Sequence, residues 1–384
     1  METTSFGRAI RPLWPLDEDV VFLNHGSYGA APRAVLVAQQ HWRDRLEANP
    51  VNFMKRVLPE ALEQAKARLA AFLAASPSDL AFVDNATSGV NAVLRSLDFR
   101  PGDEILINSH TYNAVRQTVR HVAARTGAVP VEADIPFPLS GPQPILEAIS
   151  ARLGARTRLV ILDHITSPTA TIMPLAPLID AAKAAGAAVL VDGAHAPGML
   201  PLDLPAIGAD YYTGNCHKWL CAPKGCAFLW VDPARQAGIH SLTISHYYEK
   251  GFGAEFAWTG TRDPSAWLAV TAALDFLDEL GGLEAVTAYT HRLAHEAAAM
   301  LAAAWGTEVG GPPDMRGSMA SIRLPDRYAD PSLTAQMVMD RLWSEHRIEI
   351  PILRFAGQPW ARISAAPYSE MAEYAMLNQA IGEG

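Results

Sequence analysis

Cysteine is scarce in this sequence, an excess of basic residues is absent, and no hydrophobic run is long enough for a membrane span. The three cysteines among 384 residues give no disulfide framework, as is typical of a reducing compartment. The 31 lysines and arginines are outnumbered by 40 aspartates and glutamates, which argues against a surface for nucleic acid or anionic membrane. Because residues 1–16 contain no apolar run, we expect no signal peptide and a cytoplasmic protein.

Apolar residues make up 49% of the chain, enough to fill more than one hydrophobic core, and the length suggests two or three domains of roughly 150 residues each. Short apolar runs alternate with alanine-rich stretches in the middle of the chain, which predicts an α/β core with a parallel sheet covered by helices. The expected strands are Leu80–Val83, Glu104–Ile107, Leu159–Leu162, Ala188–Val191 and Cys226–Trp230, and the expected helices are Thr87–Leu97 and Leu175–Ala185.

The pattern changes to long helices near Asp263. The expected elements are helices at Ser265–Leu280 and Leu283–Ala304, a strand at Ser318–Leu324 and a helix at Leu333–His346. We therefore expect a large α/β domain over residues 19–262 and a smaller α+β domain over residues 263–384. Residues 1–18 are expected to pack on the second domain.

The strongest local signal joins an acidic residue after an apolar strand to a lysine further along the chain. Asp192 stands at the carboxyl end of the expected strand, where open α/β sheets bind ligands. Lys218 follows a Gly-Asn turn and neighbours His217, and a partly buried ammonium near another cation loses its proton more easily. Taken alone, Asp192 could be a helix cap and Lys218 a solvated lysine. Together they resemble a pyridoxal phosphate site with a Schiff-base lysine.

Longer segments resemble the class V aminotransferase superfamily of fold type I, in which cysteine desulfurases and isopenicillin N epimerases are found. They are Phe22–Gly29, Asn85–Gly89, Asp192–His195, Asn215–Lys218, Pro223–Gly225, Trp258–Asp263 and Arg362–Ser364. The segments are most similar to the isopenicillin N epimerase-like branch, which also contains carbon–sulfur lyases of the ergothioneine type. The resemblance implies a mostly parallel seven-stranded sheet in a large α/β/α domain and a smaller α+β C-terminal domain.

The resemblance also implies pyridoxal 5′-phosphate as the cofactor and assigns roles around its ring. Lys218 would bind the aldehyde and shuttle protons, and Asp192 would pair with the pyridine nitrogen. His195 matches the position beside the phenolic oxygen, where a donor stabilises the oxyanion. The stacking residue stays open between His110, which aligns with the desulfurase histidine, and Tyr112, which fits the epimerase-like branch better.

The phosphate end of the site is expected at Thr87 and Ser88. These residues follow a strand and begin a helix, so their amides and hydroxyls can hold a dianion, although the same residues also suit an ordinary N-cap. By resemblance His217 contacts the phosphate, and Asn215 stands where desulfurases often carry serine but can still donate. Thr261 matches a residue that reaches the phosphate of the neighbouring subunit. This match implies a homodimer with a shared active site.

By resemblance, Arg362 grips the α-carboxylate of the substrate with its two-pronged donor, and Asn24 is a second contact. Desulfurases place a nucleophilic cysteine shortly before this arginine, but Phe355–Ala361 contains none, so a persulfide-forming desulfurase is not expected. All three cysteines instead flank Lys218. Their spacing with His217 lacks the Cys-x-x-Cys pairs of structural zinc sites, so we expect no metal.

The expected function is an enzyme acting at the Cα–H bond of an amino acid or a derivative, with Lys218 taking the α-proton. Reprotonation on the opposite face gives epimerisation, the first-ranked outcome by resemblance. Loss of a β-substituent gives a carbon–sulfur lyase, ranked second, and transamination is third. The alternative outside catalysis is a retired member that binds the cofactor as a regulatory protein. The joint presence of Lys218, Asp192 and Arg362 argues against this alternative.

Overall fold

The computed structural model of the chain describes residues 6–383. A seven-stranded sheet has the order β2-β8-β7-β6-β5-β3-β4. Its strands are β2 (Leu80–Val83), β3 (Glu104–Asn108), β4 (Val129–Ala133), β5 (Thr157–Asp163), β6 (Ala188–Asp192), β7 (Tyr211–Asn215) and β8 (Ala227–Val231). Only β8 runs antiparallel to both of its neighbours, and the other pairs are parallel. The predicted mostly parallel seven-stranded sheet is confirmed.

Each predicted strand of this sheet is present, because buried parallel strands are nearly continuous apolar runs. Two strands have no counterpart in the prediction. β4 is an edge strand with a proline and several exposed side chains. β7 is buried between β6 and β8 and reads Tyr-Tyr-Thr-Gly-Asn, in which the final Gly-Asn pair is typical of a turn.

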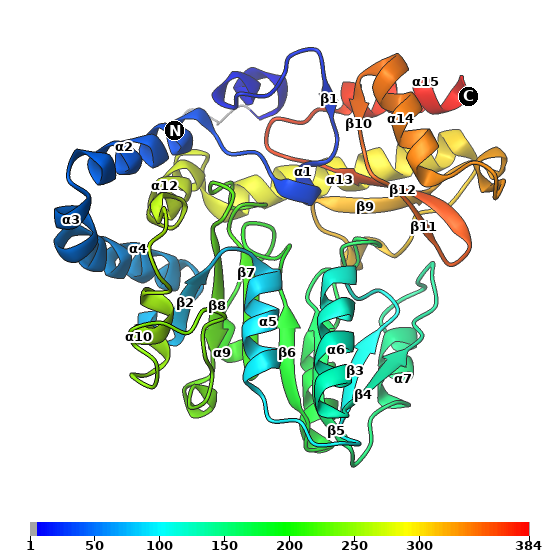
Figure 1. The fold of residues 1–384 in the computed structure, drawn as a ribbon. Helices are drawn as coiled ribbons and strands as arrows, with labels where there is room; N and C mark the ends of the chain where they lie inside the picture. Colours follow the sequence, from blue (N-terminus) through cyan, green and yellow to red (C-terminus); the bar gives the residue numbers. More distant parts are fainter. Residues whose placement is uncertain (1–5, 384) are drawn as a thin grey trace.

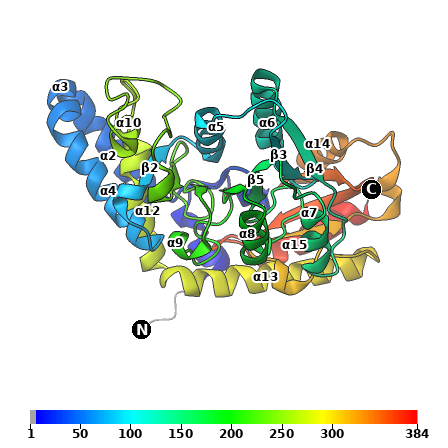
Figure 2. The same cartoon turned by 90° about the horizontal axis from the view of Figure 1, so that it is seen from below.

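Helices cover both faces of the sheet, as Figures 1 and 2 show. One face packs against α5 (Ala86–Ser96) and α6 (Asn113–Thr126) through a cluster that contains Ile105 and Ile161. The alternate residues Leu106 and Val160 point to the other face, where they share a cluster with side chains of the next two helices. These are α7 (Gln143–Ser150) and α8 (Leu175–Ala184).

A group of helices flanks the β2 edge of the sheet (Figure 1). They are α2 (Arg33–Ala48), α3 (Pro50–Asn52), the π-helix η2 (Phe53–Val57), α4 (Leu58–Phe72) and α10 (Phe252–Ala257). The predicted helix over residues 265–280 is divided into α11 (Ser265–Leu268) and α12 (Val270–Glu279). Side chains of α11 and α12 belong to the same hydrophobic cluster as Val35 of α2 and Leu62 of α4.

A smaller antiparallel sheet, ordered β11-β12-β9, lies above the large one in Figure 1 and has its own hydrophobic cluster. Its strands are β9 (Met319–Arg323), β11 (Ile352–Phe355) and β12 (Gln358–Ser364). The helices beside it are α13 (Gly282–Trp305), α14 (Ala335–His346) and α15 (Met371–Gly382), and the two-stranded pair β1 (Val21–Phe22) and β10 (Ile348–Glu349) adjoins it. The domain division at residue 262 stays a prediction.

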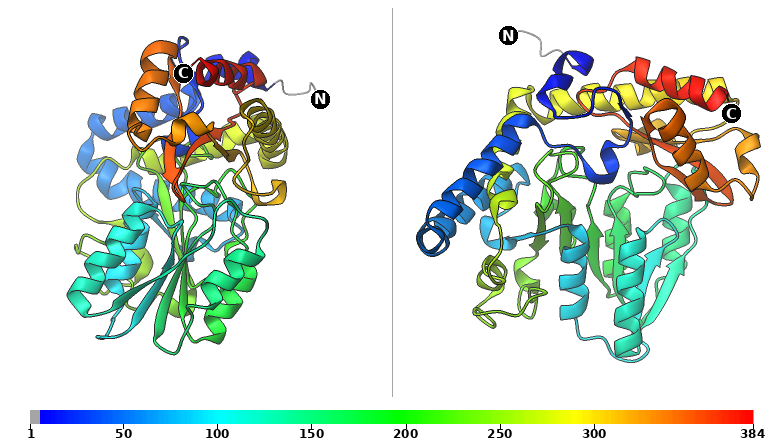
Figure 3. Two further views of the ribbon diagram at one scale, coloured as in Figure 1. Left: turned by 90° about the vertical axis from the view of Figure 1, so that its right-hand side faces the viewer. Right: turned by 45° about the horizontal axis from the view of Figure 1, so that its top comes forward.

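The N-terminal segment returns to this smaller part, where Figure 3 shows it beside the C-terminal helix. Phe6 stacks on Tyr289 of α13, and Arg11 in η1 (Gly7–Leu13) pairs with Glu373 of α15. The remaining short helices are α1 (His25–Tyr28), α9 (Leu204–Ile207), η3 (Pro77–Asp79), η4 (Pro233–Arg235), η5 (Pro313–Met315) and η6 (Asp326–Ala329). Within residues 6–383, no helix combines the length and apolar character that crossing a bilayer requires.

Candidate active site

Polar side chains surround a cavity of about 570 Å³ at the carboxyl ends of β5, β6 and β7, beside the first turn of α5. The lining residues are Ser27, Tyr28, Asp84, Asn85, Ala86, Thr87, Ser88, Tyr112, Asp163, Ile165, Ser167, Asp192, Ala194, His195, Asn215, His217, Lys218, Lys224 and Gly225. Most of the predicted site residues are among them, and the exceptions are Asn24, His110, Thr261 and Arg362. The cavity lies where an open α/β sheet is expected to bind its ligand.

Asp192 ends β6 and is buried in the cavity wall. Its Oδ1 accepts a hydrogen bond from the Ala194 N–H at 3.0 Å. This turn requires glycine at position 193, because a Cβ there would lie 2.2 Å from the Tyr212 hydroxyl oxygen. Burial raises the pKa of Asp192, whereas the Ala194 amide and the charge of Lys218 lower it. A cationic ligand atom beside this carboxylate would further favour its charged form.

The Lys218 side chain, only 9% exposed, faces a histidine whose tautomer the structure indicates. Its Nζ lies 3.1 Å from His195 Nε2, and His195 Nδ1 accepts from Trp219 Nε1 at 3.4 Å. Because an indole N–H can only donate, the neutral imidazole carries its hydrogen on Nε2. This N–H can donate to Nζ only when the lysine amine is unprotonated.

The electrostatics of the pair agree with that arrangement. Burial lowers the pKa of Lys218 to about 7, the charge of Arg362 acts in the same direction, and Asp192 opposes them. Burial also lowers the pKa of His195 well below its ordinary value, and the charge of Lys218 adds to this effect. A neutral amine facing a neutral imidazole is therefore populated near neutral pH, and such an amine is a nucleophile.

The N-terminal segment fixes the backbone of this lysine. His25 Nε2 donates to the Lys218 carbonyl oxygen at 3.0 Å, and His25 Nδ1 accepts from the Tyr368 hydroxyl at 2.8 Å. Burial lowers the pKa of His25 to about 4, so the ring is neutral. Gly29 has a φ of +68°, and a Cβ there would lie 2.0 Å from the His217 carbonyl oxygen. Only glycine permits this close approach.

The first turn of α5 forms another wall of the cavity. Asn85 caps the helix by accepting from the Ser88 N–H at 2.9 Å, and Asn215 Oδ1 accepts from the Ala86 N–H at 2.8 Å. Asn215 thus joins the end of β7 to the start of α5 besides lining the cavity. Thr87 and Ser88 line the cavity at the positive end of the helix dipole, a position that suits an anion.

His217 also lines the cavity. Its Nδ1 donates to the Cys226 carbonyl oxygen at 3.1 Å, which leaves Nε2 as the acceptor of the neutral ring. Burial lowers the pKa of His217 to about 4, and the charges of Lys218 and Lys224 add to this effect against the Cys226 hydrogen bond. The ring would donate from Nε2 to a phosphate only as a cation, a form that an adjacent dianion would favour.

Arg362, in β12, lies directly behind the cavity wall and is only 3% exposed. Its Nη1 donates to the Ser167 carbonyl oxygen at 2.6 Å and its Nη2 to Ser27 Oγ at 3.0 Å, and both serines line the cavity. Within the described chain, Arg362 Nε has no hydrogen-bond partner. Burial lowers the pKa of Arg362 to about 10. Asn24 lies behind Ser27, and its amide nitrogen donates to Glu349 Oε1 at 3.2 Å.

The two candidates for ring stacking occupy different environments. His110 is buried outside the cavity lining, with Nδ1 2.7 Å from Thr169 Oγ1 and Nε2 3.3 Å from the Ile135 carbonyl oxygen. Its ring packs edge-on against Phe355. Tyr112 lines the cavity and is 46% exposed. Tyr112 is therefore the one of the two whose ring a ligand in this cavity can reach.

Thr261 does not line the cavity that contains Lys218 in its own chain. It is exposed beside a separate, largely apolar groove of about 910 Å³. The groove is lined by Pro50, Val51, Met54, Lys55, Leu58, Pro59, Leu62, Glu63, His246, Tyr247, Ala254, Ala257, Trp258 and Thr261. The predicted contact between Thr261 and the phosphate of a neighbouring subunit stays a prediction.

The three cysteines are buried, and none of them lines the cavity. Burial raises the pKa of Cys221 to about 12, so its thiol is not ionised at neutral pH. The turn between β11 and β12 contains no cysteine. In residues 6–383 there is also no cluster of three histidine, cysteine, aspartate or glutamate side chains arranged to hold a metal ion.

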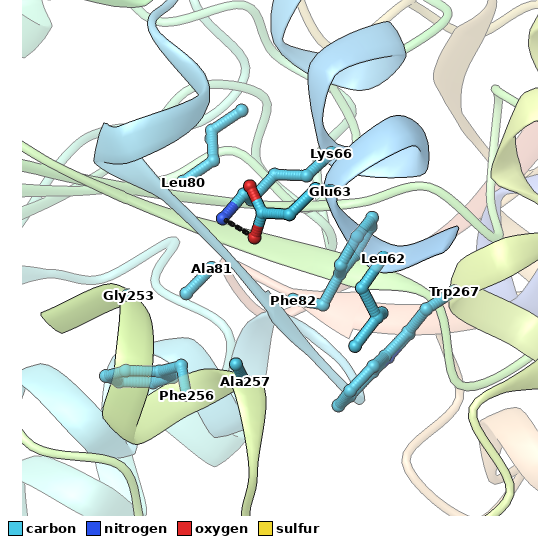
Figure 4. Close-up of a pocket in the computed structure, with 10 residues that line it drawn as sticks. All are labelled: Leu62, Glu63, Lys66, Leu80, Ala81, Phe82, Gly253, Phe256, Ala257 and Trp267. Atoms are coloured by element: carbon cyan, nitrogen blue, oxygen red, sulfur yellow. Dashed lines mark hydrogen bonds and ion pairs between the residues drawn. The ribbon is translucent and has the colours of Figure 1, made fainter. Parts of the chain in front are cut away.

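Figure 4 shows a different pocket, between α4, β2 and α10. Its volume is about 20 Å³, enough for one water molecule, and most of its lining is apolar. The charged pair in it, Lys66 and Glu63, forms an ion pair at 2.8 Å. This pocket offers neither the space nor the free polar groups of the Lys218 cavity.

Several functional contacts escape prediction from the sequence. Ser27, Ser167 and Asp163 line the cavity, and His25 and Trp219 hold the residues around Lys218. His25 and Ser27 lie in the segment Phe22–Gly29, whose family resemblance is the one sequence feature from which their importance could be predicted. Nothing in the local sequence distinguishes Ser167, whereas Asp163 directly follows the predicted strand Leu159–Leu162, the same signal that marks Asp192.

Comparison with known families and proteins agrees with this geometry. The family Aminotransferase class-V matches residues 21–350. An isopenicillin N epimerase of Streptomyces clavuligerus is 36% identical over 384 residues, covering 95% of either chain. An L-cysteine desulfhydrase of Arabidopsis thaliana is 30% identical over 397 residues, covering 95% of this chain and 87% of the relative.

Solved structures share the fold at lower identity. A complex of the cystine C-S lyase C-DES with cysteine persulfide has a TM-score of 0.81 and 23% identity, covering 95% of this chain and 98% of that one. The cysteine desulfurase CsdA of Escherichia coli has a TM-score of 0.80 and 22% identity, covering 99% and 98%. These likenesses show that the chain has the predicted fold type I.

Proposed function

The chain belongs to the aminotransferase class-V family and is a pyridoxal 5′-phosphate enzyme, and we propose that it epimerises an amino acid or a derivative at Cα. The observation that carries the proposal is the buried Lys218 amine, 3.1 Å from His195 Nε2, in a cavity that also holds Asp192 and the start of α5. The relative from Streptomyces clavuligerus, named isopenicillin N epimerase, supports the choice of reaction.

The cavity suits each end of the cofactor. Asp192 would hold the pyridine nitrogen in its protonated form, and Thr87, Ser88 and the first turn of α5 would hold the phosphate. Lys218 would bind the aldehyde carbon. We propose that Tyr112 lies against the ring, because it lines the cavity and His110 does not.

When bound, the cofactor ring accepts the electron pair released at Cα. With the cofactor in place, Lys218 Nζ would act as the general base that takes the proton from Cα. The His195 Nε2–H group can then hydrogen-bond to the neighbouring oxygen of the bound cofactor. Epimerisation needs a second proton donor on the face opposite Lys218, and Tyr112 is the hydroxyl residue proposed for that face.

The substrate carboxylate would bind at Arg362. Its charge is buried directly behind Ser27 and Ser167, which line the cavity, so a bound carboxylate would supply a counter-charge. Ser27 and Ser167 hold the two terminal nitrogens and fix the guanidinium plane. Asn24 would orient Ser27 rather than contact the carboxylate itself, because its amide nitrogen is held by Glu349.

A carbon–sulfur lyase is the second candidate. The relative from Arabidopsis thaliana named L-cysteine desulfhydrase supports it, and both reactions begin with removal of the Cα proton. Buried cysteines argue against a persulfide-forming desulfurase, because no thiol lines the cavity. Transamination is the third candidate.

We also propose a homodimer in which Thr261 reaches the phosphate of the neighbouring subunit. The large apolar groove beside Thr261 supports this assembly, since a second copy would cover it. Exposed apolar side chains of the adjoining segment, Leu242, Ile244, Tyr247 and Tyr248, would be covered in the same contact.

The cofactor attachment is tested by Lys218→Ala. Wild-type protein loaded with pyridoxal 5′-phosphate should show a visible absorbance band that borohydride removes, and this variant should lack it. Lys224→Ala is the matched control, because Lys224 is the other lysine lining the cavity, and it should keep the band. A reducible band that survives in Lys218→Ala would refute the assignment.

The reaction is tested by following proton–deuterium exchange at Cα across a panel of amino acids, with chirality, keto acid and released thiol measured together. Exchange with inversion supports epimerisation. Release of the β-substituent supports the lyase, and keto acid with aminated cofactor supports transamination. Absence of exchange with every substrate, despite an intact lysine-dependent band, would favour the non-catalytic alternative.

A further inference from the structure

Two carboxyl groups stand side by side in the cavity. Asp163 is the last residue of β5 and Asp192 the last residue of β6, and the two are direct partners in the parallel pairing of these strands. Neighbouring strands are about 4.8 Å apart. Both residues are buried and both line the cavity. Two charged carboxylates at this spacing would repel each other strongly, since little water screens them.

The surroundings of Asp163 do not favour its charged form. Its Oδ2 has no hydrogen-bond partner among residues 6–383. The groups that face it from the end of β3 are neutral, and they are the Asn108 and Thr111 side chains and the Tyr112 backbone amide. Burial and then the negative charge of Asp192 raise the pKa of Asp163 well above its ordinary value, and these neutral donors oppose the shift only in part.

The surroundings of Asp192 favour its charged form more than those of Asp163 do. Asp192 accepts a hydrogen bond from the Ala194 N–H, and Lys218 acts on it as a cation whenever the amine is protonated, whereas the groups that face Asp163 from the end of β3 are neutral. When neighbouring buried carboxyl groups compete for one negative charge, the group beside a cation takes it. The charge therefore belongs on Asp192, and the proton on Asp163.

We propose that Asp163 is a positioning residue that keeps its proton at neutral pH and so leaves one negative charge, on Asp192, for the ring nitrogen of the cofactor. This role rests on the proposed function of Asp192. No donor in the described chain reaches the buried Oδ2, so nothing there stabilises a negative charge on that oxygen. An ionised Asp163 would place a second negative charge beside a ring nitrogen that carries only one positive charge.

The test is the pH dependence of urea-induced unfolding of the cofactor-free protein. The variants are Asp163→Asn and the smaller Asp163→Ser, which both lack the titrating proton. Asp180→Asn is the control, because Asp180 is an exposed aspartate on α8, outside the cavity. Unfolding is measured from about pH 4, where an unfolded aspartate titrates, to about pH 8.

In the wild type, the folded chain should hold the Asp163 proton after the unfolded chain has lost it, so stability should fall as the pH rises. The two Asp163 variants lack this titrating group, so their stability should not decrease in this way. Their folding equilibrium constant should therefore rise relative to the wild type by up to about tenfold per pH unit until Asp163 itself ionises. Asp180→Asn should show no such rise, and a purely structural role would change stability equally at every pH.

A difference from the wild type that stays constant across this pH range would overturn the proposal. If one variant fails to fold, the other decides. Because the measurement uses no cofactor, it is separate from the Lys218→Ala test. A lost absorbance band in Lys218→Ala with a flat Asp163 profile would reject only the positioning role, and the reverse outcome would reject only the assignment of Lys218.

Discussion

At the scale of single residues, the chemistry depends on how the fold shifts the proton equilibrium of Lys218. The amine is buried beside His195 and within the field of Arg362, and these surroundings lower its pKa to about 7. An exposed lysine would be almost fully protonated at neutral pH and a poor nucleophile. The same burial that costs folding energy therefore supplies the reactive form of the amine.

The pH dependence of cofactor uptake follows from this pKa. Only the unprotonated amine attacks an aldehyde, so the uptake rate of cofactor-free protein should rise with pH, with a midpoint near 7, and then level off. Arg362→Gln removes a positive charge and should move the midpoint upward by up to about one unit. Stopped-flow absorbance measures the rate.

Arg354→Gln is the control, because Arg354 in β11 is exposed and bonds to backbone carbonyls. It should leave the midpoint unchanged. A midpoint near that of an ordinary lysine would show that burial does not activate Lys218.

The sequence predicts the chemical residues better than their supports. Asp192 and Lys218 are predictable because one follows an apolar strand and the other follows a Gly-Asn pair close to His217, both local features. The predicted Gly-Asn turn is wrong, because Gly214 and Asn215 pair with β8 as the last two residues of β7. Asp163 also follows a predicted apolar strand, Leu159–Leu162, but its importance comes from the register of β5 against β6, which no local pattern contains. Trp219 sets the tautomer of His195 only because the chain brings the two together.

At the scale of elements, α5 supplies the anion site only if its first turn is held in place. Asn85 caps that turn and Asn215 ties it to β7, so the strand that leads into Lys218 also carries the support of the phosphate site. The sequence predicts this helix within a residue of its observed start. It does not predict β7, because the Gly-Asn pair that ends this short strand is typical of a turn, although Tyr211, Tyr212 and Thr213 favour a strand.

Loss of a helix cap should lower stability at either α5 or α9, but only loss of the α5 cap should also weaken cofactor binding. Asn85→Ala should lower the free energy of unfolding by about 1 kcal/mol and weaken cofactor binding several-fold. Asp203→Ala removes the cap of α9, where Asp203 accepts from the Ala206 N–H, and should cost similar stability without changing cofactor affinity. Urea unfolding and fluorescence titration measure the two quantities. Equal affinities in the two variants would contradict an anion site at α5.

At the scale of the whole molecule, the proposed dimer makes each active site depend on two chains. Lys218→Ala should be inactive and Thr261→Ala impaired. A mixed dimer contains one site with both residues intact, so random mixing of equal amounts should restore about a quarter of wild-type activity. Activity after denaturation and refolding of the mixture, with sedimentation to count subunits, measures this. Activity no higher than the average of the two parents would argue against sharing.

The change of pattern near Asp263 and the family resemblance both predict a second, smaller α+β part, but the local pattern does not predict how the helices divide between the two hydrophobic cores. The smaller sheet has its own hydrophobic cluster, yet residues 266–280 pack into the core that contains α2 and α4. The change of composition near Asp263 predicts a change of secondary structure, because secondary structure is largely a local property. It does not predict the packing partner of each helix, because that depends on residues far away in the sequence.

The stretch Asn24–Gly29 has a consequence for the history of the family. It contacts both Lys218 and Arg362, because His25 binds the Lys218 carbonyl oxygen and Ser27 binds the Arg362 guanidinium. At its end, Gly29 packs closely against the His217 backbone. Gaining or losing one residue there would displace amine and guanidinium together. Relatives that have diverged to other reactions should therefore preserve its length, and inherited differences in substrate choice should accumulate elsewhere around the cavity.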